Sequence, residues 1–261
     1  MNKTPREQAH GEIERIFRIL MPQNGLAVRE EQIALCHTML DTLLQNKIAL
    51  CDAGVGIGKT YAYLTACVLL KRFFPSPQPV VVSTSSVALQ NAVIGEYVPF
   101  LSRIFLENRI IQKPIRAIVR KGKERFVCDV RLKFRLEAVE GKRKNEEQRK
   151  ALVSLRNYYD LDDVPDLSQF DREQVCVPKA CRNDCPIRTA CRYHQYLRAA
   201  RNAGIFMQIC NHNYLLADAS HRLQELRPLL QDYRALVIDE AHKLPEAARQ
   251  MLSLIHISEP T

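Results

Sequence analysis

Residues 53–60 read AGVGIGKT, and this stretch decides the class of fold. It follows the phosphate-loop pattern, with alanine in place of the usual first glycine. In that pattern, small residues let backbone N–H groups close around phosphate oxygens, and the helix that follows points its positive end at the same anion. The glycines that would form this cradle are Gly54, Gly56 and Gly58. The stretch therefore predicts a nucleotide-binding α/β domain.

A second stretch, residues 235–242, reads ALVIDEAH and is an apolar strand that ends in two carboxylates. Lys59 of the first stretch is placed to reach the β- and γ-phosphates of a nucleotide, and the Thr60 hydroxyl is placed to bind Mg²⁺. Asp239 would complete the metal site, while Glu240 would orient or deprotonate the attacking water. The two stretches lie about 180 residues apart, yet each stands at the end of a strand. We expect them to form one ATP–Mg²⁺ site in an ATP-hydrolysing domain.

The chain has nine cysteines, and five of them fall within residues 128–191, in the middle of the stretch between the two nucleotide motifs. These five are Cys128, Cys176, Cys181, Cys185 and Cys191. The N-terminus reads as charged rather than apolar, and a phosphate loop is typical of a reducing cytoplasm, where disulfides are disfavoured. Clustered cysteines in that setting indicate metal ligands. Zinc and an iron–sulfur cluster are both open, although irregular spacing with a distant first ligand suits the cluster.

Six stretches of the chain occur in the order typical of one protein family. They are VREEQ (28–32), DAGVGIGKT (52–60), VVSTS with LQ (81–85 and 89–90), KGKERFVC (121–128), CNHNYLLAD (210–218) and DEAHKL (239–244). On these residues the chain resembles a DinG-type member of the XPD-like, iron–sulfur-containing superfamily 2 DNA helicases, over roughly residues 26–251. Two positions depart from the family pattern: Val55 replaces the commoner threonine, and Arg125 stands where an asparagine is common.

The resemblance implies a RecA-like parallel-sheet domain of the P-loop NTPase type, with a Cys-rich, mostly helical iron–sulfur insertion. A 4Fe-4S cluster would be held by Cys128, Cys181, Cys185 and Cys191, with Cys176 as the alternative to Cys181. The nucleotide site would also include three residues outside the phosphate loop. They are Arg29, Gln32 at the adenine edge, and His242 of the DEAH box.

The activity that the resemblance implies is ATP-dependent unwinding of single-stranded or forked DNA, 5′ to 3′, in DNA repair. The enzyme would be a cytoplasmic monomer. The alternative is a nucleic-acid-binding ATPase, or a nuclease-associated DinG-like protein, that does not unwind DNA processively.

Motifs and the alternation of strands with helices predict how the chain is organised. Residues 1–25 read as an N-terminal helix, 26–119 as the first part of the motor domain, 120–204 as the iron–sulfur insertion and 205–251 as the second part of the motor domain. Strands are expected at 47–51, 80–84, 115–119, 205–210 and 236–239, and helices at 6–21, 29–45, 58–73 and 87–93. Strands this apolar are typical of a parallel sheet that is covered on both faces.

Positive charge is concentrated at the start of the predicted insertion. The chain carries a net charge of +9, and residues 113–150 hold fourteen Lys or Arg against six Asp or Glu. Such a block predicts contact with the phosphate backbone of a nucleic acid. The alternative is a solvated helix face, because residues 142–147 mix both signs. Aromatic residues nearby would either stack on bases or form the core of a small domain. They are Phe126, Phe134, Tyr158 and Tyr159.

The last ten residues, LSLIHISEPT (252–261), resemble no part of the helicase family. They match the translation of a transposon-type sequencing adapter, CTG TCT CTT ATA CAC ATC TCC GAG CCC ACG. We therefore expect residues 252–261 to be an artefact that follows an interrupted reading frame. No apolar run approaches the roughly 20 residues that a membrane span needs, so no membrane association is expected.

Overall fold

The structure is a computed structural model, and it describes residues 3–54, 56–140, 146–181 and 184–257, with side chains described as far as residue 251. The chain forms two compact units. Unit 1 comprises Met1–Arg120 and Ala203–Thr261, and unit 2 comprises Lys121–Asn202. The predicted tail, residues 252–261, lies outside the described side chains.

Unit 1 is built on a four-stranded sheet in which every pair of neighbouring strands is parallel. The strands are β1 (Val80–Thr84), β2 (Ala117–Arg120), β3 (Met207–Asn211) and β4 (Ala235–Ile238), in the order β2-β3-β1-β4. All five residues of β1 are buried, as expected for an interior strand with both faces covered. The α/β class and the parallel sheet predicted from the sequence are confirmed.

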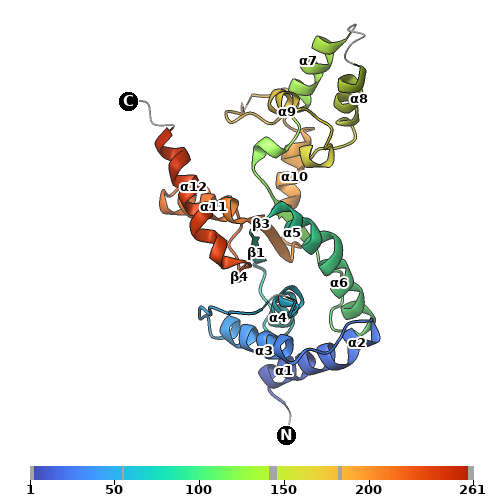
Figure 1. Cartoon of the computed structure of the whole chain (residues 1–261), viewed down its shortest axis with the longest axis vertical. Helices are drawn as coiled ribbons and strands as arrows, with labels where there is room; N and C mark the ends of the chain where they lie inside the picture. Colours follow the sequence, from blue (N-terminus) through green and yellow to red (C-terminus); the bar gives the residue numbers. More distant parts are fainter. Residues whose placement is uncertain (1–2, 55, 141–145, 182–183, 258–261) are drawn as a thin grey trace. The chain divides into compact units, whose positions relative to one another are not determined.

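Unit 1 also contains helices. They are α1 (Pro5–Arg15), which continues through a π-helical turn η1 (Ile16–Leu20) into α2 (Met21–Gln23), then α3 (Glu30–Leu44), α4 (Lys59–Phe73), α5 (Val87–Ala92), η2 (Val93–Tyr97), α6 (Val98–Glu107), α11 (His212–Leu223) and α12 (Leu244–Ile257). Helices α11 and α12 lie on one side of the strands, and α5 and α6 lie on the other (Figure 1). The first helix begins at a capping box, because the Thr4 side chain accepts from the Glu7 N–H and the Glu7 carboxylate accepts from the Thr4 N–H.

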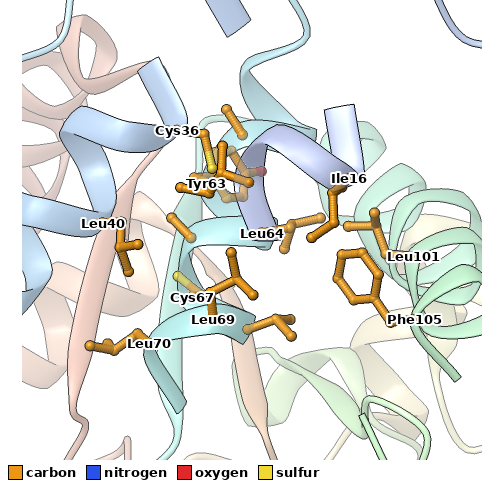
Figure 2. Close-up of a cluster of buried hydrophobic side chains, with 14 of the residues drawn as sticks. Ile16, Cys36, Leu40, Tyr63, Leu64, Cys67, Leu69, Leu70, Leu101 and Phe105 are labelled. Carbon is orange, nitrogen blue, oxygen red and sulfur yellow. The ribbon is translucent and has the colours of Figure 1, made fainter. Parts of the chain in front are cut away.

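Helix α4 lies at the centre of the largest apolar cluster. Its residues from Ala62 to Leu70 are all buried, and α1 and α3 pack against it. Figure 2 shows side chains of this cluster, with Tyr63 of α4 beside Cys36 of α3 and with Leu64 of α4 beside Ile16. A helix that is apolar on nearly every side belongs in a core, so α4 is held firmly in place behind the loop that precedes it.

The strand expected at residues 47–51 is not formed, and this prediction is wrong. Its apolar side chains lie in solvent, with Ile48 95% and Leu50 93% exposed. The alternation of apolar residues there is typical of a strand, but a strand also needs a neighbour to supply its ladder of hydrogen bonds. The backbone of this segment makes no such ladder, although β4 ends the sheet in the order observed.

Unit 2 is mostly helical. Its elements are η3 (Lys123–Arg125), α7 (Asp129–Val139), α8 (Glu146–Ser154), η5 (Leu161–Asp163), α9 (Gln169–Val175) and α10 (Arg192–Ala200). Its small core is made of Val, Leu and a few partly buried side chains, and it is separate from the core of unit 1. A buried carboxylate ties three of its segments together: Asp171 is 1% exposed and accepts from Arg135, Gln148 and Ser168. Among the described residues, no helix is long and apolar enough to cross a membrane.

Candidate nucleotide-binding site

The phosphate loop enters α4 through a left-handed glycine. Gly58 has φ +88° and caps the helix, and Gly56 has φ +84°. A side chain at position 58 would also meet a neighbour, because an added Cβ would clash with the amide nitrogen of Gln32. The left-handed backbone therefore favours glycine at this position, and any side chain there would also displace the Gln32 amide. The loop consequently presents the N-terminus of α4 to the site.

Two residues from the start of α3 hold the phosphate loop. Gln32, only 5% exposed, donates from Nε2 to the Gly58 carbonyl at 2.7 Å. The Arg29 guanidinium donates to the Gly56 carbonyl. The sequence predicted that Gln32 would read the adenine edge, whereas its amide nitrogen here supports the loop itself. Arg29 and Gln32 are thus placed at the predicted site, in contact with its backbone.

The two nucleotide motifs meet although they are far apart in the sequence. Lys59 Nζ donates to the carbonyls of Ala53 at 3.1 Å and Gly54 at 3.4 Å, and it lies 3.9 Å from Glu240 Oε1. Asp239 continues the β4 ladder, because its N–H donates to the Ser83 carbonyl at 2.8 Å. Asp239 is 8% exposed, and this burial raises the pKa of its carboxyl group, with nearby Glu240 adding to the rise.

Glu240 stands at a sharp turn after β4. Its backbone is left-handed, with φ +56° and ψ +44°, and the short helix η6 (Ala241–Lys243) follows. Left-handed backbone in a residue with a side chain costs about 1–3 kcal/mol, and such strain gathers at functional sites. The turn separates the two carboxylates, so that Asp239 is buried while Glu240 is only partly covered. His242 lies beyond the turn, 65% exposed, with Nδ1 3.5 Å from Glu240 Oε2.

A pocket of about 340 Å³ opens where these segments converge. Eight of the predicted site residues line it, and they are Arg29, Gln32, Gly56, Gly58, Lys59, Thr60, Asp239 and Glu240. Leu26, Tyr61, Leu89 and Tyr97 give the pocket apolar and aromatic surface as well. Gly54 and His242 are not among its described lining residues. The volume lies in the range of small-molecule sites, and the mixture of aromatic and charged groups suits a ligand with a ring and phosphates.

Sequence reasoning missed Tyr63. Its hydroxyl donates to Asp239 Oδ2 at 3.3 Å, and the side chain is 2% exposed. Tyr63 stands four residues after Lys59 on α4, so both side chains lie on the same face of the helix. Burial, followed by the charge of Asp239, raises the pKa of the Tyr63 hydroxyl, so it remains a donor. The four-residue spacing from Lys59 is the signal that could have revealed it.

A second missed residue, His212, joins the ends of three strands. Its Nδ1 lies 2.8 Å from Ser83 Oγ at the end of β1, and the ring follows directly after β3. His212 is 3% exposed, and burial lowers its pKa, while the backbone of Glu240 and of Asp239 acts in the opposite direction. The ring therefore lies against the turn that carries both carboxylates. His212 belongs to the CNHNYLLAD stretch, to which the sequence assigned no role in the site.

The five central cysteines, the predicted cluster ligands among them, lie in unit 2. Among the described residues, no three Cys, His, Asp or Glu side chains are arranged to hold a metal ion. The expectation that Cys128, Cys185 and Cys191 converge with a fourth thiol on a metal therefore stays a prediction. Neutral thiols do not attract one another, and ligand sets of this kind assemble when they lose protons to a bound metal.

The thiols nevertheless differ in their surroundings. Burial raises the pKa of Cys128, and Cys191 and Cys181 are near enough to add to this rise. Cys176 has partners of its own: its thiol donates to the Glu173 carbonyl at 3.4 Å and accepts from Arg131 at 3.7 Å. Cys176 is thus engaged with protein groups, whereas Cys181 is exposed.

Comparison with known proteins gives relatives named 3'-5' exonuclease DinG. The chain is 24% identical over 250 residues to the 3'-5' exonuclease DinG of Staphylococcus saprophyticus and 25% identical over 250 residues to that of Staphylococcus haemolyticus. It is 24% identical over 251 residues to the protein of the same name from Staphylococcus aureus. Each match covers 94% of this chain and 26% of the relative, so the chain spans about a quarter of the length of these proteins. No protein-family model matches the chain. The resemblance to DinG-type proteins predicted from the motifs is confirmed.

Proposed function

We propose that this chain is the nucleotide-binding motor domain of a DinG-like, ATP-dependent DNA helicase. One observation carries the proposal: Lys59 of the phosphate loop and the Asp239–Glu240 pair converge on one pocket, with Lys59 Nζ 3.9 Å from Glu240 Oε1. The parallel sheet with α4 behind the phosphate loop is consistent with a RecA-like domain. In such a motor, hydrolysis in the pocket would drive 5′ to 3′ movement along a DNA strand.

Each residue has a specific task in this proposal. On nucleotide binding, Lys59 would leave the carbonyls of Ala53 and Gly54 for the β- and γ-phosphates. Thr60 and Asp239 would hold Mg²⁺, which neutralises charge on the phosphates when it is bound. Glu240, in the turn that follows β4, would orient or deprotonate the attacking water. The buried side chain of Asp239 and the partly exposed side chain of Glu240 suit this division of roles.

The test is nucleotide binding by the 261-residue chain. Fluorescent ADP with Mg²⁺ should bind to the wild type, and Lys59→Ala should weaken this binding by at least tenfold, because the β-phosphate loses its cation. Lys71→Ala is a matched control, since Lys71 lies on the same helix and donates to the Gln78 carbonyl outside the pocket. Equal binding by wild type and Lys59→Ala would refute the proposed site.

We also propose that unit 2 carries a 4Fe-4S cluster, with Cys128, Cys181, Cys185 and Cys191 as ligands. The donor set is right for a cluster, because all four are thiols, and Cys176 is already engaged with Arg131 and Glu173. Protein purified without oxygen should be brown and contain iron and acid-labile sulfide. Cys181→Ser should lose the iron while Cys176→Ser keeps it. A colourless protein with one zinc ion would exclude the cluster.

The same unit is the proposed contact surface for single-stranded or forked DNA. Lys133 and Lys150 have side chains 76% and 74% exposed, and each pairs with a glutamate one helical turn away, at 4.0 Å and 3.2 Å respectively. Phe134 is 64% exposed and Tyr158 45% exposed, as stacking on bases would require. Phe126, in contrast, is 1% exposed and packs against Tyr159 and Tyr196, so it belongs to the core of the unit.

A second function has its own support, because the relatives carry the name 3'-5' exonuclease. In that case the pocket would serve a nuclease-associated ATPase that binds nucleic acid without processive unwinding. Assays on a longer protein that includes the remaining length of the relatives would distinguish the helicase from the nuclease-associated ATPase. Strand separation that requires ATP favours the helicase, while ATP-independent shortening of 3′ ends without separation favours the nuclease.

A further inference from the structure

Asp239, which lines the pocket, has a buried tyrosine as a hydrogen-bond partner. Tyr63 Oη lies 3.3 Å from Asp239 Oδ2, and the tyrosine is buried, with only 2% of its surface exposed. The neighbouring contact of Lys59 with Glu240 comes from the same face of α4, one turn earlier. The consecutive carboxylates of Asp239 and Glu240 thus each contact a side chain of α4, and these two side chains are four residues apart.

The Tyr63 ring is fixed by the core, so its hydroxyl is fixed too. The ring belongs to the largest apolar cluster and packs among residues of α3 and α4, including Cys36 (Figure 2). Phenylalanine would fill the same space without placing a polar atom in the core. A buried hydroxyl is unfavourable unless it makes a hydrogen bond. The hydrogen bond from its hydroxyl to Asp239 therefore best explains why this position has tyrosine and not phenylalanine.

The hydroxyl also lies next to the other predicted Mg²⁺ ligand. Thr60, three residues before Tyr63 on α4, is near enough to form a hydrogen bond with it. Tyr63 thus stands between the two side chains that the metal would need in a defined relative position. A carboxylate that accepts a hydrogen bond at one oxygen has its rotation restricted and keeps the other oxygen for the metal. Outer partners of this kind orient metal ligands in many proteins.

We propose that Tyr63 is a positioning residue for the Mg²⁺ site: its hydroxyl holds Asp239 Oδ2 and leaves Oδ1 to the metal. The inference rests on the proposed nucleotide site and adds a residue to it. Tyr63 acts through the ligands beside it, chiefly through Asp239, to which its hydroxyl donates. Its removal should change the dependence on Mg²⁺ and leave the contacts to the nucleotide itself intact.

Tyr63→Phe tests this, since it removes the hydroxyl and keeps the ring. Fluorescent ADP binding to the 261-residue chain is measured with excess EDTA and across a titration of MgCl₂. Affinity for ADP in EDTA should equal that of the wild type, while the Mg²⁺ concentration for half-maximal enhancement should rise roughly tenfold, the loss expected for a hydrogen bond to a charged group. Tyr214→Phe is the matched control, because it removes another largely buried hydroxyl, one paired with Arg120 outside the pocket.

Asp239→Asn shows whether the effect passes through the carboxylate. In that background, Tyr63→Phe should cause no further change in the Mg²⁺ titration. An unchanged or tighter Mg²⁺ dependence in Tyr63→Phe, equal losses with and without Mg²⁺, or a full additional effect on top of Asp239→Asn would each overturn the positioning role. Failure of the wild type to bind ADP at all would instead refute the nucleotide site on which the inference rests.

Discussion

Gly58 combines two local constraints, and both can be tested by one substitution. Gly58→Ala should destabilise the chain by about 1–2 kcal/mol through its left-handed backbone, and by more if Gln32 cannot withdraw from the new Cβ. It should also weaken ADP binding, because the phosphate loop must shift. Chemical denaturation and ADP titration measure the two effects.

Gly11→Ala is the matched control for this change. Gly11 lies inside α1, and an added Cβ there would meet nothing within 4 Å. Since alanine is the better helix former, this variant should gain about 0.5–1 kcal/mol. If both variants had the same stability, the special geometry at Gly58 would not matter to the fold.

His212 should make stability depend on pH. Burial lowers its pKa from the model-compound value of 6.5, so the folded chain keeps the ring neutral where the unfolded chain takes up a proton. The unfolded state therefore binds more protons below about pH 6.5, and stability should fall as the pH drops from there towards the lowered pKa. His212→Gln should flatten this slope in denaturant titrations between about pH 7 and pH 5.

His242→Gln provides the comparison, because His242 is 65% exposed and lies outside the pocket lining. This variant should keep the slope of the wild type. A slope unchanged in His212→Gln would show that other groups cause the dependence on pH.

At the scale of elements, α1 is attached to α3 by a chain of polar contacts. His10 Nδ1 lies 2.6 Å from His37 Nδ1, and the outer nitrogens of the two rings contact Asp41 at 2.9 Å and Glu14 at 2.7 Å. Hydrogen bonds from Arg18 and His37 lower the pKa of Glu14, and those from Arg6 and His10 lower that of Asp41 against the effect of burial. These contacts join the predicted N-terminal helix to the element that carries Gln32.

Acid should loosen this attachment. A carboxylate with a lowered pKa contributes stability that is present above its unfolded value and is lost as the pH falls through its folded value. The loss therefore begins near pH 4 and continues below it. Hydrogen exchange in α1 should rise over that range, and Asp41→Asn should produce the faster exchange already at neutral pH. Glu107→Gln, an exposed change on α6, should leave α1 protected; equal protection in both variants would argue against the attachment.

How far the sequence predicts an element depends on where its partners lie. The strand expected at 80–84 is β1, because a run of five apolar or small residues bounded by turn formers already indicates a buried strand. Residues 47–51 show a similar pattern, but their pairing depends on distant backbone, and the pattern alone could not supply it. The same distinction applies to the site. Lys59 and Asp239 were predicted from motifs, whereas Tyr63 and His212 act through contacts 176 and 129 residues away in the chain.

At the scale of the whole molecule, the two units have separate cores. The apolar cluster of unit 2 contains residues from Val127 to Val175, and the largest cluster of unit 1 draws on both of its chain segments, up to Ala235. The proposed nucleotide pocket lies within unit 1, and the proposed cluster ligands lie within unit 2. Each ligand should therefore stabilise its own unit.

Calorimetry of the 261-residue chain should accordingly show two transitions that respond to different ligands. ADP with Mg²⁺ at about 100 times its dissociation constant stabilises the folded state that binds it by about 2.7 kcal/mol, so the transition of unit 1 should move upward by several degrees. Removal of iron by a chelator should lower only the other transition. Lys59→Ala should abolish the first response and keep the second, and Cys181→Ser should do the reverse. A single transition that both ligands move together would show that the units unfold as one, and that the separation of their cores does not divide the stability of the chain.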